Sequence, residues 1–69
     1  MEAVEVPGCP NGSLFVANYV TEKRPDKAKF LLPDAECVSV LRLLLPLLGY
    51  RVSVKGLGDR WLLEAVRAD

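Results

Sequence analysis

Residues 28–54 read AKFLLPDAECVSVLRLLLPLLGYRVSV, and this stretch decides the fold of the chain. Its first five residues, 28–32, have the pattern of a short strand with Phe30 and Leu32 on one face. Pro33 and Asp34 then open a helix, with Asp34 as the N-cap residue. The helix itself is predicted from apolar residues at helical spacing, namely Cys37, Val38, Leu41, Leu44, Leu45 and Leu48.

The end of this helix and the strand after it are equally well marked. Gly49 is the expected C-cap residue, and Pro46 removes one hydrogen bond within the helix and loosens its last turn. Residues 50–55 alternate between apolar and polar side chains, which is the two-residue period of a strand. The central stretch is therefore a strand–helix–strand unit.

The flanking sequence extends this unit on both sides. Val4 and Val6 alternate with Glu5 as in a short strand, and a first helix is predicted from Pro10 to about Glu22. Val16 and Val20 centre the buried stripe of that helix. Downstream, residues 56–59 are a hairpin connection and residues 60–66 a last strand, in which Trp61, Leu63 and Ala65 share one face.

The resulting order, βαβαββ, predicts an α+β domain that occupies residues 1–69. If both strand–helix–strand units are right-handed crossovers, the two helices cover one face of a mixed four-stranded sheet. The other face is wet, because these polar residues point away from the apolar side: Glu5, Lys29, Arg51, Ser53, Lys55, Arg60 and Glu64. We therefore expect a two-layer sandwich.

Composition excludes several classes of function. The chain has 69 residues, a net charge of zero, no histidine and two cysteines. Without histidine, Cys–His and Ser–His nucleophile pairs and the common zinc sites are excluded, so no metal and no cofactor is expected. The acidic start and the short apolar run around Pro46 predict neither a signal peptide nor a membrane span. We expect a cytoplasmic protein.

Cys9 is the residue most suited to chemistry. It precedes Pro10 at the predicted start of the first helix, where free backbone N–H groups and the positive end of the helix dipole favour a thiolate. The N–H groups of Asn11 and Gly12 are the expected donors to that sulfur. The plainer interpretation is a small buried residue that happens to precede a helix.

At these residues the chain resembles the TusA/SirA-like sulfur-carrier family. The resemblance lies in residues 4–10 (VEVPGCP), in the apolar positions of the helix after them, in residues 32–35 (LPDA) and in residues 49–52 (GYRV), within the same order of elements. The family opens its first helix with Cys-Pro-x-Pro, whereas Gly12 replaces the second proline here. The family glycine also usually lies three residues before the cysteine, whereas Gly8 is adjacent to Cys9.

The resemblance implies a sulfurtransferase-type persulfide carrier. Cys9 would accept sulfur from a donor protein of the desulfurase or rhodanese type and pass it to an acceptor protein. Transfer of this kind requires a thiolate and access to it, and no histidine.

Two other functions stay open. The first is a thioredoxin-like thiol redox protein that uses Cys9 and Cys37. Both helices are expected to start at the same edge of the sheet, so the two cysteines could be neighbours. A disulfide needs Cα atoms within roughly 7 Å, whereas packed helices lie about 8–10 Å apart, so a bond requires a favourable stagger and we expect Cys37 to be an ordinary core residue instead. The second is a binding module without sulfur chemistry. Val40, Leu43 and Leu47 form a second apolar stripe that either packs on the first helix or is exposed for a partner or a homodimer.

The remaining features favour simple interpretations. Four basic residues cluster around the first loop, Lys23, Arg24, Lys27 and Lys29. No aromatic residue interleaves with them, so we do not expect nucleic-acid binding. Such a group is a solvated loop or a docking site for an acidic partner surface.

Overall fold

The computed structural model describes residues 3–9 and 11–68. Its elements follow the predicted order: β1 (Val4–Glu5), α1 (Asn11–Lys23), β2 (Lys27–Leu32), α2 (Ala35–Leu47), β3 (Tyr50–Gly56) and β4 (Trp61–Arg67). Each bound differs from the sequence prediction by only a residue or so, except that Pro10 lies outside the described residues.

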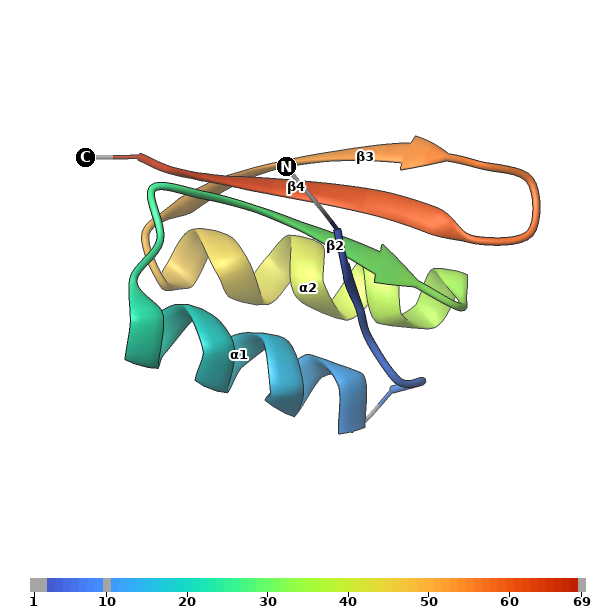
Figure 1. The fold of residues 1–69 in the computed structure, drawn as a ribbon, viewed down its shortest axis with the longest axis horizontal. Helices are drawn as coiled ribbons and strands as arrows, with labels where there is room; N and C mark the ends of the chain where they lie inside the picture. The colour runs from blue at the N-terminus through green and yellow to red at the C-terminus, as the bar shows by residue number, and fades with distance from the viewer. Residues whose placement is uncertain (1–2, 10, 69) are drawn as a thin grey trace.

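The four strands form one mixed sheet in the order β1-β2-β4-β3. β1 pairs with β2 in parallel, and β4 lies antiparallel between β2 and β3. β2 and β3 therefore run in the same direction, with the last strand inserted between them. Both helices cover the same face of this sheet (Figure 1), which confirms the α+β two-layer sandwich.

The core lies between the sheet and the helices. Its largest fully buried side chains are Tyr50, Phe30, Leu32, Leu41, Leu45, Leu63, Val16 and Val20. The strand residues among them occupy the predicted apolar face, and Val16 and Val20 centre the buried side of α1 as expected. No described residue with a polar or charged side chain, other than Tyr50, is buried. The core is thus apolar, and hydrophobic burial holds the two layers together.

One end of the sandwich is fixed by contacts between the two helix–strand turns. The hydroxyl of Tyr50 donates to the carbonyl oxygen of Pro25 at 2.8 Å, and the guanidinium of Arg24 lies 5.3 Å from the centre of the Tyr50 ring. Arg24 also donates to the carbonyl oxygen of Leu48 at 3.0 Å. Arg24 therefore joins the two turns. This structural role was not expected from the interpretation of the basic cluster as a solvated loop.

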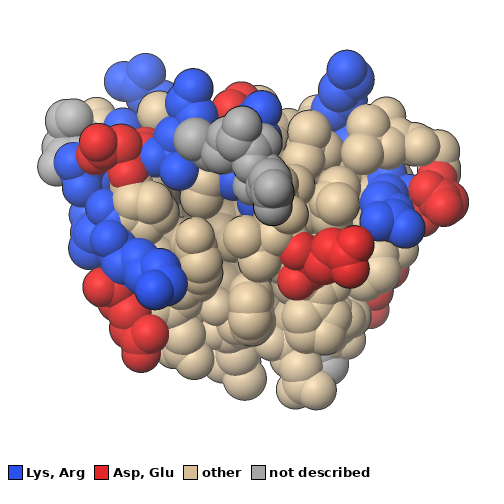
Figure 2. All heavy atoms as spheres, viewed as in Figure 1, with Lys and Arg blue, Asp and Glu red and all other residues tan. Residues whose placement is uncertain are grey.

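The outer side of α2 exposes apolar side chains. Leu43 is 76% exposed and Leu47 is 82% exposed, and Val40 beside them is also exposed. Of the two interpretations of this stripe, packing against α1 is wrong for Leu43 and Leu47. On the face shown in Figure 2, the lower part of the molecule, where the helices lie, carries few charged side chains. Within the described residues, neither helix has the length and apolar character needed to cross a membrane.

Candidate functional site: the Cys9–Cys37 pair

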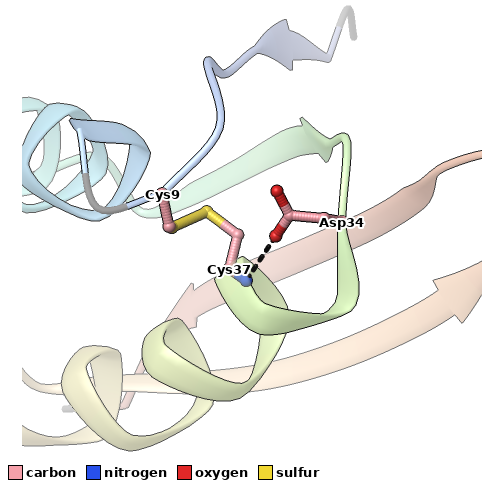
Figure 3. Close-up of a disulfide and its surroundings, with 3 residues drawn as sticks. All are labelled: Cys9, Asp34 and Cys37. Carbon is pink, nitrogen blue, oxygen red and sulfur yellow. Dashed lines mark hydrogen bonds between the residues drawn. A yellow bond between two sulfur atoms is a disulfide. The ribbon is translucent and has the colours of Figure 1, made fainter.

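Both helices begin at the same end of the sheet, and the two cysteines meet there. Cys9 lies in the connection between β1 and α1, and Cys37 lies in the first turn of α2. Their sulfur atoms form a disulfide across a sequence separation of 28 residues, with the two Cα atoms 5.2 Å apart. Figure 3 shows the bond crossing from the start of one helix to the start of the other.

The expectation for Cys37 is therefore only half correct. Cys37 is a core residue, with 0% of its surface exposed, but it is also bonded to Cys9. The distance between packed helices is measured between their axes, whereas a Cα atom stands about 2.3 Å off its axis. Cys9 also precedes α1 rather than lying within it, so its Cα approaches α2 more closely than the axes do.

The first turn of α2 is fixed by its N-cap residue. Asp34 has an extended backbone, with φ −144° and ψ 161°, and its carboxylate accepts a hydrogen bond from the backbone N–H of Cys37 at 2.8 Å. This confirms the predicted cap. The second carboxylate oxygen faces Gly8, 3.5 Å from the position that a Cβ would take there. Asp34 thus places Cys37 and brings one negative charge close to the disulfide (Figure 3).

Gly12 makes room for the close approach of the start of α1 to Cys37. It is buried, and a Cβ on it would overlap the carbonyl oxygen of Pro7 and lie 2.9 Å from Cγ1 of Val6 and 3.0 Å from Sγ of Cys37. A sequence signal for this was present, because Gly12 continues the buried stripe of Val16 and Val20 at intervals of four residues. The role predicted for Gly12 was instead that of a hydrogen-bond donor to the sulfur.

In the disulfide form, the backbone N–H of Gly12 donates to the carbonyl oxygen of Gly8 at 3.0 Å, and its role as a donor to a charged sulfur stays a prediction. The bond closes a helical turn around Cys9. A proline at position 12, as the Cys-Pro-x-Pro motif would require, has no N–H for this bond and would place its ring against Pro7. Asn11 is the exposed first residue of α1, and its expected role at the sulfur stays a prediction. Pro10 lies outside the described residues.

The two cysteine residues differ in exposure. Cys9 is half-buried, whereas Cys37 is fully buried beneath it.

A pocket of about 210 Å³ lies nearby at the ends of β1 and β2, and neither cysteine lines it. Its lining residues are Glu5, Val6, Leu31, Leu32, Pro33, Asp59 and Arg60. In residues 3–9 and 11–68 no three His, Cys, Asp or Glu side chains gather as a metal site would require. The chemistry that this site offers is that of sulfur.

Comparison of the chain with protein-family models, with curated proteins and with solved structures found no match in any of the three. The resemblance to the TusA/SirA-like family therefore rests on the sequence segments named above and on the order of the elements.

Proposed function

We propose that this protein is a small sulfur-relay protein that carries sulfur as a persulfide on Cys9. The observation that supports the proposal best is the position of Cys9, which is half-buried and lies two residues before Asn11, the first residue of α1. At that position the helix dipole favours a thiolate, and the partial exposure of the residue supports access by a partner protein. The order of elements, which agrees with that expected from the resemblance, is a second support.

Two exchange steps make up the relay. The Cys9 thiolate attacks the outer sulfur of a persulfide on a donor protein of the desulfurase or rhodanese type, and the donor cysteine leaves as a thiolate. A thiolate of the acceptor protein then attacks the outer sulfur on Cys9, and Cys9 leaves as a thiolate. Neither step changes the overall oxidation state. The disulfide with Cys37 is the resting oxidised form, and an external dithiol must open it before loading.

We infer a cytoplasmic location for this relay, where thioredoxin and glutathione keep most thiols reduced and a disulfide of this kind is transient.

The relay predicts that the reduced Cys37→Ser variant gains about 32 Da, the mass of one sulfur atom, when it is incubated with a cysteine desulfurase and cysteine. The increment should map to Cys9 by peptide mass spectrometry and be absent from Cys9→Ser. Cys37→Ser serves as the matched variant in which the other thiol cannot interfere. If Cys37→Ser is folded but gains no sulfur on Cys9, the relay proposal fails.

A second candidate function is a thiol redox protein that uses Cys9 and Cys37, which the disulfide between them favours. This function predicts a reduction potential in the range of catalytic dithiols, about −270 to −120 mV, whereas a purely structural disulfide lies below about −300 mV. Equilibration in glutathione buffers, with thiols counted by alkylation and mass, measures the value. Two free thiols that persist under mild oxidant would exclude the redox function.

A further inference from the structure

The arrangement of the two cysteines is asymmetric. Cys37 has no exposed surface, whereas Cys9 is half-buried. A sulfur donor, whether a protein or a small molecule, therefore reaches Cys9 first. Once Cys9 is loaded, its own sulfur is the inner atom of the persulfide, and the added sulfur is the outer atom.

The surroundings hold the Cys37 sulfur next to that inner atom. The two Cα atoms are 5.2 Å apart, the N–H of Cys37 is bound by Asp34 at 2.8 Å, and the missing Cβ of Gly12 leaves the space that Sγ of Cys37 approaches. These contacts use the backbone N–H of Cys37, the carboxylate of the N-cap residue Asp34 and the backbone of Gly12, all at the starts of the two helices. A reduced Cys37 is therefore placed to attack without a large movement of either helix.

Building on the proposed function, we propose that Cys37 is a resolving cysteine that converts the persulfide on Cys9 into sulfide. The sulfur of Cys37 attacks Sγ of Cys9 as its thiol proton passes to the outer sulfur, the bond between Sγ and the outer sulfur breaks, and the outer sulfur leaves as hydrosulfide. The two cysteine sulfurs are oxidised to the disulfide, and the outer sulfur takes up the electron pair, so no external oxidant is needed. A dithiol reductant then reopens the disulfide and completes a cycle of persulfide reduction.

The inner sulfur is the expected point of attack because the observed bond joins Cys37 to that atom. Attack on the outer sulfur would instead move the persulfide onto Cys37, deep in the core, where the outer sulfur has no exposed path to an acceptor. The structure thus gives the loaded protein two outcomes: transfer of sulfur to a partner that arrives in time, or release of sulfide when none does.

The test uses reduced, reductant-free protein and one equivalent of glutathione persulfide. Wild-type protein should release one sulfide per chain and lose about 2 Da as the disulfide forms. Cys37→Ser should retain the added sulfur on Cys9, with a persulfide lifetime at least about tenfold longer because the attack within one molecule is lost. Cys9→Ser gives the background release from the reagent itself.

The outcomes separate the two proposals. A Cys37→Ser protein that takes up no sulfur contradicts the relay itself. A wild-type protein whose persulfide on Cys9 lasts as long as that of Cys37→Ser, or whose added sulfur maps to Cys37, overturns the resolving role while leaving the relay intact. Cys37→Ala, which adds no polar group to the core, replaces Cys37→Ser if the latter does not fold. The disulfide and sulfide yields of wild-type protein test the step in either case.

Discussion

At the scale of single residues, Gly12 links the local backbone to the site. Its N–H closes the turn around Cys9, and its missing side chain leaves space for Pro7, Val6 and the Cys37 sulfur. In the interior of a helix, glycine is usually destabilising by about 1 kcal/mol relative to alanine. Here the close approach outweighs helix propensity, so the glycine is required for the packing of α1 against the start of α2.

Gly12→Ala should therefore destabilise the protein, although the same change in an open helix position stabilises it. We expect a loss of about 1–3 kcal/mol in the free energy of unfolding, as for other overpacked sites, together with slower formation of the disulfide. Urea denaturation of the reduced protein measures the first effect, and thiol trapping measures the second. Asn18→Ala, at an exposed position of the same helix, is the control. Equal or greater stability of Gly12→Ala would contradict the packing role.

The position of Cys9 could be predicted from the sequence, whereas its bond to Cys37 could not. The position of Cys9 before Pro10 indicated a sulfur at the start of a helix, because that inference depends only on local capping rules. The bond to Cys37 depends on the distance between two helices, and that distance is set by side chains that lie between them. A glycine at position 12 shortens this distance, so the relevant information lay in a third residue.

At the scale of elements, most of the structure followed from periodicity. Apolar residues alternate with a period of two in both strands of the hairpin, as in a β-strand, and recur every three to four residues after Asp34, as in an α-helix. The exposed stripe on α2 was ambiguous because an apolar residue beside the buried stripe can lie in the core or outside it. Which one applies is decided by where α1 packs, and the sequence of α2 does not contain that information.

Two leucines of α2 should respond very differently to truncation. Leu45 is fully buried whereas Leu47 is 82% exposed, so Leu45→Ala should cost about 2–5 kcal/mol and Leu47→Ala less than about 0.5 kcal/mol. Chemical denaturation gives both values. If the protein forms a homodimer through the exposed apolar stripe of α2, Leu43→Ser and Leu47→Ser should weaken self-association in sedimentation experiments without changing the stability of the monomer. Similar costs for the two alanine variants would contradict the assigned packing.

At the scale of the whole molecule, the sheet order could not be predicted from the sequence. The pattern of β4 fits a place at the edge as well as one between β2 and β3, because both positions bury one face and leave the other wet. Pairing between strands distant in the chain depends on tertiary contacts. The architecture was nevertheless predictable, since right-handed crossovers put both helices on one side.

Reduction of the disulfide should lower the stability of the folded chain. Closing a loop with a sequence separation of 28 residues contributes about 3.6 kcal/mol through the unfolded state. A domain of 69 residues has a total stability of only roughly 3–10 kcal/mol. Urea denaturation with and without a phosphine reductant should show this difference for wild-type protein. Cys9→Ala, which has no bond in either condition, should show none, and equal midpoints for wild-type protein would contradict the prediction.

The disulfide also affects how firmly the first strand, β1, is attached to the sheet. β1 joins the sheet through two residue pairs, Val4 with Phe30 and Glu5 with Leu31, and through one further bond from the Val6 N–H to the Leu31 carbonyl. The covalent link at Cys9 anchors the other end of that segment. When the link opens, these contacts and the buried side chain of Val6 are left to hold β1 against β2, so we expect the segment to fray more readily. The oxidation state of the two cysteines thereby determines how firmly the edge strand β1 is held on the sheet.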